Sequence, residues 1–147
     1  MIRTSASVAL ILAGAILCSA RPDESLEELM ARADRASGGR QADLCLEVSG
    51  RALTLTIDSY KQEKVGDAQA SLGELVAYAD KARAAAMHSG KKVKHTEIKL
   101  REMAGRLRDL KGDVGADEQS GVQAAIDKLE AFRTELLKSM FGSKSHD

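Results

Sequence analysis

Apolar residues recur at intervals of three and four along most of the chain after residue 23, which is the spacing of one face of an α-helix. The clearest stripe lies between Ser120 and Met140, where charged residues fall mostly on the other faces. This segment is predicted to be a core-facing helix of a bundle. Its apolar positions are Val122, Ile126, Leu129, Phe132, Leu136 and Met140.

Three other long segments and one short segment carry the same periodicity. The short helix is predicted to have Asp23 as its N-cap and to end at Ser37-Gly38-Gly39. We therefore predict an all-α fold, an antiparallel bundle of four to five helices that forms a single domain over residues 21–141. The longer helices are expected over Gln41–Glu63, over Asp67–Ser89, and from Val93 or Thr96 to Leu110.

The predicted helices are separated by residues that favour turns. Gly66 is expected to end the second helix, Asp67 to cap the third, and Gly90 to stop the third. Residues 111–119 include two glycines and three acidic residues and are expected to form a flexible loop. Residues 142–147 are expected to be a flexible tail.

The segment Gln41–Glu63 allows a second interpretation. Leu44, Leu46 and Val48 alternate with other residues, which is the period of a β-strand, and Ser49-Gly50-Arg51 lies where a hairpin turn would fall. We favour one helix, because no Asn-Gly or Asp-Gly turn is present and an isolated two-stranded hairpin is marginally stable. A small β-hairpin is the alternative.

Residues 1–20 have the three parts of a secretory signal peptide. A single cation, Arg3, precedes the apolar run Ala6–Leu17, and the small residues Cys18-Ser19-Ala20 follow it. This run is shorter than the roughly 20 residues that a membrane-spanning helix needs. We expect cleavage near Ala20 and export to the periplasm or the medium. Acylation at Cys18, as in a lipoprotein, is disfavoured because the bulky Leu17 precedes it.

The composition is that of a globular helical protein. Of 147 residues, 44% are apolar and 30% are charged, with 22 basic residues balancing 22 acidic ones, which argues against intrinsic disorder. After export Cys45 would be the single cysteine, so no internal disulfide is expected. We expect Cys45 to be a buried small apolar residue; an intermolecular disulfide or a reactive thiol is the alternative. Tyr60 and Tyr78 are expected at the edge of the core with solvated hydroxyl groups.

No set of residues has the spacing of a catalytic, metal or cofactor site. The three histidines, His88, His95 and His146, are never three or four residues apart, and a single cysteine accompanies them. No glycine-rich phosphate loop precedes a helix. We therefore predict a protein without enzymatic activity, cofactor, bound metal or small-molecule substrate. Nucleic acid is not expected as a partner, because the basic segment lacks aromatic residues on which bases could stack.

Charge is distributed unevenly along the chain. Residues 91–111 hold eight basic and three acidic residues, whereas residues 21–80 hold seven basic and twelve acidic ones. The basic segment could attract an acidic partner or an anionic surface. The alternative is that its charges pair with acidic neighbours inside the bundle or are solvated. The candidate interaction patch is Lys91, Lys92, Lys94, His95 and Lys99.

Parts of the chain resemble known helical proteins. The sequence Ile57-Asp58-Ser59-Tyr60, the turn Val65-Gly66-Asp67-Ala68 and the apolar residues that follow it are similar to one tetratricopeptide unit, without that family's Trp and closing Pro. This resemblance implies binding of a peptide or protein. The mature chain also resembles exported bacterial helical-bundle proteins of unknown function, which implies a fold and a compartment but no activity.

These observations lead to two hypotheses of function. The first is a non-enzymatic exported protein that acts through protein–protein contacts, as an adaptor, a scaffold or an envelope stress accessory; an exposed apolar groove between helices would support it. The second is a peripheral protein that binds anionic lipid or another envelope surface through residues 91–111, which would make its binding sensitive to salt.

Overall fold

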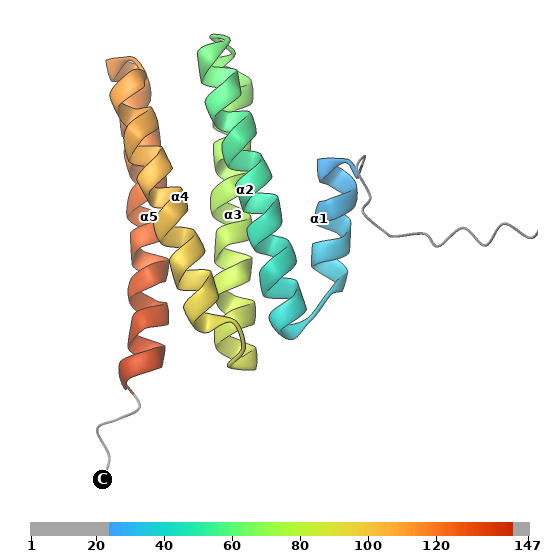
Figure 1. Cartoon of the computed structure of the whole chain (residues 1–147). Helices are drawn as coiled ribbons and strands as arrows, with labels where there is room; N and C mark the ends of the chain where they lie inside the picture. Colours follow the sequence, from blue (N-terminus) through green and yellow to red (C-terminus); the bar gives the residue numbers. More distant parts are fainter. Residues whose placement is uncertain (1–23, 143–147) are drawn as a thin grey trace, which may run out of the picture.

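The computed structural model describes residues 24–142, which form five α-helices and no β-strand (Figure 1). The predicted all-α fold is confirmed for this range. The predicted signal peptide, residues 1–20, and residues 143–147 of the predicted tail lie outside the described residues. The helices are α1 (Leu26–Arg35), α2 (Gly38–Lys61), α3 (Val65–Ser89), α4 (Val93–Asp113) and α5 (Ala116–Phe141).

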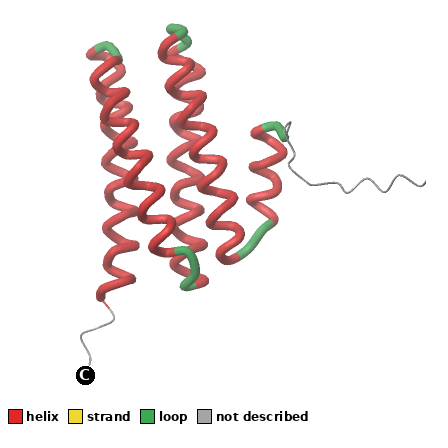
Figure 2. The backbone as a smooth tube through the Cα atoms, in the orientation of Figure 1, coloured by secondary structure: helices red, strands yellow, loops and turns green. Residues whose placement is uncertain are grey.

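The four long helices form two antiparallel hairpins, α2–α3 and α4–α5, which lie side by side (Figures 1 and 2). The closest packing is within each hairpin. Between the hairpins, α3 packs against α5, and α4 contacts both α2 and α3. The short helix α1 packs against the outer side of α2. All the connections between helices are short, as the green segments of Figure 2 show.

Helix α2 is contacted by three other helices, α1, α3 and α4. It is one continuous helix, so the β-hairpin alternative is wrong. Leu44, Leu46 and Val48 are all buried although they lie two residues apart. A helix packed on three sides is apolar around much of its circumference. The strand-like alternation in this segment therefore comes from burial by several neighbours.

Each helix contributes a fully buried leucine to one continuous core, and α3 contributes mostly alanine in its second half. The stripe predicted for α5 is confirmed at Val122, Ile126, Leu129 and Leu136. Phe132, which packs against the core, and Met140 are half-buried. The fully buried leucines are Leu29, Leu53, Leu75, Leu100, Leu107, Leu129 and Leu136.

The N-cap of α1 is Ser25, and the prediction of Asp23 is wrong. The Ser25 hydroxyl accepts a hydrogen bond of 3.1 Å from the backbone N–H of Glu28, and the Glu28 carboxylate accepts one of 3.1 Å from the backbone N–H of Ser25. This reciprocal pair is a capping box, whose Ser-x-x-Glu signature is present in the sequence. The helix ends at Arg35, before the two glycines that were expected to end it.

The turn between α2 and α3 comes three residues before the predicted one. Glu63 has a φ of 59°, and the N–H groups of Glu63 and Lys64 donate to the carbonyls of Tyr60 and Ser59. This is a Schellman motif with a non-glycine residue in the left-handed position. Gly66, expected to end α2, lies instead in the first turn of α3, and Asp67 is not its cap.

The predicted flexible loop at residues 111–119 is almost entirely helical. Helix α4 continues to Asp113, and α5 begins at Ala116, so only Val114 and Gly115 connect them. The acidic side chains of Asp117 and Glu118 lie in the first turn of α5, where the helix dipole favours negative charge. Their enrichment reflects a helix start and not a loop.

Candidate functional site: the inter-hairpin cleft

The predicted basic patch lies at the end of the bundle where the α3–α4 connection meets the start of α2. Gly39 permits this approach, because a Cβ atom there would lie 3.3 Å from side-chain atoms of Lys91 and Lys92. The Lys92 ammonium is 3.0 Å from Asp43 Oδ2, and His95 Nε2 is 3.8 Å from Asp43 Oδ1. The patch is therefore brought together around an acidic residue of α2.

Lys99 also has an acidic neighbour, Glu102, at 3.0 Å on the same helix. Within residues 24–142, Lys91 and Lys94 are the two members of the patch for which no ion pair is found, and both are exposed. Farther along α4, Arg108 pairs with Glu130 of α5. The basic segment is thus partly neutralised within the bundle, as the alternative interpretation of its charge expected.

Side-chain contacts link the two hairpins near the α3–α4 connection. Arg83 of α3 donates a 2.7 Å hydrogen bond to Glu135 of α5, and its guanidinium lies 5.4 Å from the centre of the Phe132 ring. The Lys92–Asp43 ion pair ties the start of α4 to α2 in the same region. Toward the opposite end the hairpins diverge, as Figure 1 shows.

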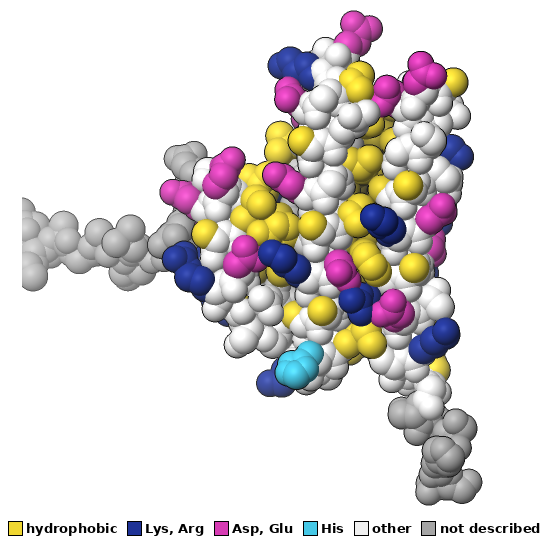
Figure 3. All heavy atoms as spheres, turned by 180° about the vertical axis from the view of Figure 1, so that it is seen from behind, with side chains coloured by type: hydrophobic (Ala, Val, Ile, Leu, Met, Phe, Trp, Pro, Cys, Tyr) yellow, Lys and Arg dark blue, Asp and Glu magenta, His cyan; other side chains and the backbone are white. Residues whose placement is uncertain are grey.

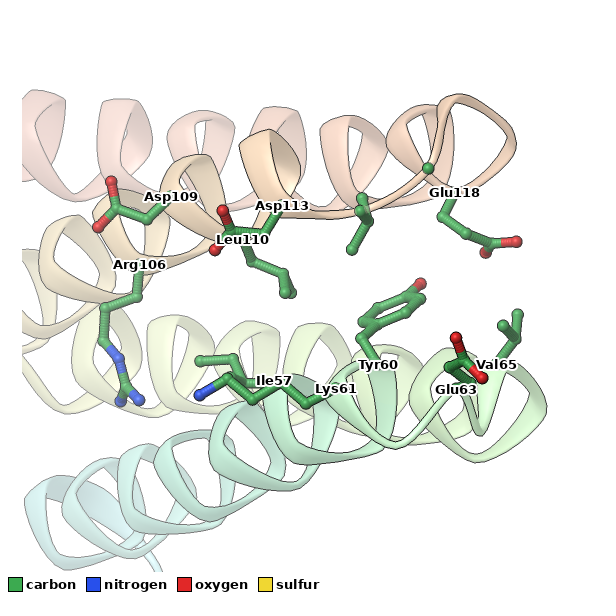
Figure 4. A pocket seen from close by; sticks show the side chains of 12 residues that line it. Ile57, Tyr60, Lys61, Glu63, Val65, Arg106, Asp109, Leu110, Asp113 and Glu118 are labelled. Carbon is green, nitrogen blue, oxygen red and sulfur yellow. The ribbon is translucent and has the colours of Figure 1, made fainter.

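Two cavities open where the hairpins diverge, and together we call them the inter-hairpin cleft. The first lies between α2 and α4, has a volume of about 570 Å³, and is walled by apolar side chains that include Ile57, Val65, Leu110 and Val114. Figure 4 shows Tyr60 projecting from α2 into this space, with Leu110 on the opposite wall.

The second cavity, of about 760 Å³, lies between α3 and α5 on the other face of the bundle. Its apolar wall is seen in Figure 3, where hydrophobic side chains fill the groove between the two helices. Tyr60 and Glu118 line both cavities. The apolar residues of this second wall are Leu72, Val76, Ala77, Ala124, Ala125 and Phe132.

The polar residues that line the cleft are predominantly acidic. Six carboxylates and three cations belong to its lining. Asp80 is the one carboxylate among them that has an ion pair within residues 24–142, with Arg83. The remaining carboxylates are Glu63, Asp109, Asp113, Asp117 and Glu118, and the cations are Lys61, Arg106 and Lys128.

One hydrogen bond crosses the cleft at its open end, and one electrostatic interaction joins the two hairpins there. Gln69 of α3 donates a 3.3 Å hydrogen bond to the carboxylate of Glu118 on α5. Burial raises the pKa of the Tyr60 hydroxyl above its ordinary value, and the negative charge of Glu118 raises it further. Tyr60 and Glu118 come from different hairpins, and both line the two cavities of the cleft.

A second polar cluster ties α1 to α3, outside the cleft. Asp34 accepts hydrogen bonds of 3.0 Å from the Tyr78 hydroxyl and 2.7 Å from the Lys81 ammonium, which lies 4.3 Å from the centre of the Tyr78 ring. The hydrogen bond from Lys81 lowers the pKa of Asp34. The expectation of a solvated hydroxyl is therefore wrong for Tyr78, which is buried and bound to Asp34.

Cys45 is fully buried, as expected, with 0% of its surface exposed. Burial raises the pKa of its thiol from 9.0 to about 11. Lys81 opposes this increase and Asp34 adds to it, so the thiol lies within the electrostatic reach of the α1–α3 cluster. At neutral pH the side chain is a protonated apolar group.

The described part of the chain offers no other site of recognisable chemistry. No group of three or more His, Cys, Asp or Glu side chains within residues 24–142 is arranged to hold a metal ion. No helix in that range has both the length and the hydropathy to cross a membrane.

The cleft was not predicted from the sequence. Its lining comes from all four long helices. The apolar periodicity of one helix indicates which of its faces is buried, but it does not indicate where two hairpins separate. Apolar residues such as Val76 and Phe132, which line the second cavity, are half-buried in the structure, but the sequence pattern does not distinguish them from core residues.

The fold and site define an all-α protein of two packed helical hairpins with an acidic-rimmed apolar cleft between them. No protein-family model, no curated protein and no solved structure matches the chain. The hairpin α2–α3, which includes the segment similar to a tetratricopeptide unit, has helices of 24 and 25 residues. It is therefore longer than one 34-residue repeat of that family.

Proposed function

We propose that this protein is a non-enzymatic, exported adaptor or scaffold whose inter-hairpin cleft binds a helical segment of a partner protein. The observation that carries the proposal is the apolar groove between α3 and α5, which is open along one face of the bundle (Figure 3). Contiguous apolar surface that is exposed and rimmed by polar residues commonly marks a site of protein–protein interaction.

The dimensions of the groove favour a helix as the bound element. Its lining on α3 runs from Gln69 to Asp80, which at 1.5 Å per residue is about 17 Å or three helical turns. A partner helix of similar length would place apolar residues of neighbouring turns along the groove. Such a helix would complete the packing that the divergence of the hairpins leaves open.

A protein partner fits this site better than an enclosed small molecule does. Sites for small ligands surround most of the ligand with protein. The wall of the second cavity comes almost entirely from two helices, with Tyr60 contributing from α2. A ligand lying on this groove would keep one side exposed, which suits an amphipathic helix with one apolar face.

Export is part of the proposal and depends on the signal-peptide pattern of residues 1–20. A partner would then be sought among periplasmic, envelope or secreted proteins. The alternative function, binding of an anionic envelope surface through residues 91–111, has less support because Lys92, His95 and Lys99 have acidic neighbours within the bundle.

The proposal is tested by selecting binders from a phage-displayed library of amphipathic helices and measuring the affinity of the selected peptides for matched variants. Ala77→Trp fills the groove, because Ala77 lines it. Ala84→Trp is the control, since Ala84 is also exposed on α3 but does not line the cleft. We expect the first substitution to weaken binding at least tenfold and the second to leave it unchanged. A library that yields no binder, or binders insensitive to Ala77→Trp, would overturn the proposal.

A further inference from the structure

We infer that the helix bound in the cleft is cationic, with Lys or Arg residues flanking its apolar face. This inference rests on the proposed function and specifies the chemistry of the partner. It follows from the carboxylates at the open end of the cleft, which have no cationic partner within residues 24–142 and surround an apolar floor.

The acidic residues are concentrated at the α4–α5 turn. Asp109 and Asp113 lie in the last two turns of α4, and Asp117 and Glu118 lie in the first turn of α5. Glu63 faces them from the α2–α3 turn, and all five belong to the lining of the cleft. The negative charge therefore lies on both hairpins at the mouth of the cleft.

The structure of a Lys or Arg side chain fits this arrangement. Its aliphatic part would lie along apolar surface beside Tyr60 and Leu110, while its charged end would reach the carboxylates at the rim. The influence of Glu118 on Tyr60 indicates that a carboxylate lies near the middle of this path. Complementary charge at the rim would also speed association and fix the orientation of the helix.

Three cations, Lys61, Arg106 and Lys128, line the cleft, half as many as its six carboxylates, so the lining keeps a net negative charge. Lys91 and Lys94 lie at the opposite end of α4, a helix of 21 residues and therefore about 30 Å long. Exposed charges separated by more than a Debye length, about 8 Å at physiological salt, are largely screened from each other.

The same charge argues against two other occupants. A second copy that docked cleft to cleft would bring the carboxylates of both mouths together, and an anionic lipid surface would meet like charge. Both like-charge contacts are unfavourable, whereas a cationic helix gains attraction without losing the apolar contact of its other face.

The test uses two synthetic amphipathic helical peptides with the same apolar face, one flanked by Lys and the other by Glu. Their affinities for the full chain are measured by fluorescence anisotropy at 50 mM and 500 mM NaCl. We expect the Lys peptide to bind at least tenfold more tightly at low salt. This preference should shrink at high salt, because exposed charges are then screened.

A charge-reversed variant carries the substitutions Asp80→Lys, Asp117→Lys and Glu118→Lys, at the three carboxylates that line the groove between α3 and α5. Its circular dichroism spectrum must match that of the unsubstituted chain before the affinities are compared. The variant should prefer the Glu peptide. The control variant has the same charge change on exposed carboxylates outside the cleft, Glu27→Lys, Glu102→Lys and Asp127→Lys, and should keep the preference for Lys.

Equal affinity for the two peptides, or tighter binding of the Glu peptide, would overturn this inference. If the peptides bind in this way and their binding is lost in the Ala77→Trp variant, the proposed function survives while the inference fails. Binding of neither peptide also overturns the inference, and the proposed function is then decided by the library selection, which does not depend on the charge of these two peptides.

Discussion

Arg133 of α5 donates two hydrogen bonds, from Nε at 3.0 Å and Nη2 at 2.7 Å, to the same carboxylate oxygen of Glu97 on α4. Both side chains are largely buried, with exposed fractions of 17% and 7%. Arg133 also contacts Glu130, which in turn pairs with Arg108 of α4. This network alternates between the two helices of the second hairpin and fixes how they align along their length.

Breaking this pair should destabilise the fold more than removing it whole. Glu97→Leu alone leaves a buried guanidinium with one partner fewer, which should lower the free energy of unfolding by about 2 to 4 kcal/mol, and Arg133→Leu is the other single substitution. The double substitution Glu97→Leu with Arg133→Leu removes both charges and should cost less than the sum of the single changes. Urea denaturation of the four proteins in the cycle measures the coupling. Strict additivity would show that the two residues act independently.

Truncation of the α5 stripe should be costly at the positions that are fully buried. Leu129→Ala or Leu136→Ala should lower the free energy of unfolding by about 2 to 5 kcal/mol, the usual cost of removing a buried leucine side chain. Leu55→Ala is the control, because Leu55 is 45% exposed. Its effect should stay below about 0.5 kcal/mol. Comparable effects at all three positions would contradict the assigned core.

The position of the α2–α3 turn makes an unusual prediction for Gly66. Because Gly66 is inside α3 and a Cβ atom there would meet nothing within 4 Å, Gly66→Ala should stabilise the protein by about 0.5 to 1 kcal/mol. Glu63→Gly should also be stabilising, since Glu63 has a positive φ. Thermal denaturation measures both. Destabilisation by Gly66→Ala would mean that the chain reverses at Gly66 instead.

The buried thiol of Cys45 should make stability fall at alkaline pH. Its pKa is 9.0 in an ordinary environment and about 11 in the fold, so the folded chain favours the protonated form. The resulting stabilisation is complete below pH 9 and is lost as the pH rises to 11, by about 2 to 3 kcal/mol in total. Cys45→Ala should lack this part of the decline, measured by urea unfolding from pH 8 to 11. Parallel curves for the two proteins would refute the prediction.

Binding to anionic membranes, the alternative function, should be weak if it occurs at all. Each exposed lysine near such a surface contributes about 1 kcal/mol, so Lys91 and Lys94 together supply only about 2 kcal/mol. We expect no stable sedimentation of the full chain with vesicles that contain anionic lipid at 150 mM NaCl. Salt-sensitive sedimentation that disappears in a variant with Lys91, Lys92 and Lys94 all changed to Ala would instead support the alternative.

The sequence was sufficient to predict the helical class and most of each helix, because those depend on interactions between residues close in the chain. It was insufficient wherever several helices meet. Leu44 and Leu46 alternate like strand residues because α2 has neighbours on three sides. Glu63 takes a left-handed conformation that its residue type does not favour, so the nearby Gly66 was the more obvious but wrong turn residue.

The basic patch and the inter-hairpin cleft also differ in how far the sequence predicts them. The basic patch was predicted as a cluster in the sequence, yet its pairing with Asp43 depends on the distant start of α2. The cleft depends on the angle between two hairpins, which no single helix specifies. Tyr60 and Glu118 are 58 positions apart and meet only because of that angle.

The connection from Gly90 to Lys92 and the contacts around it join the hairpins at one end, so the angle between the hairpins there determines how far apart their other ends lie. Each hairpin is a lever arm of about 30 Å, so a rotation of about 5° at this pivot displaces the far tips by about 2.6 Å. At the open end the Gln69–Glu118 hydrogen bond joins α3 and α5, and near the α3–α4 connection the Arg83–Glu135 hydrogen bond joins the same two helices. The angle between the hairpins near Lys92 therefore sets the width of the cleft at its open end, and under the proposed function it would limit the diameter of the helix that fits there.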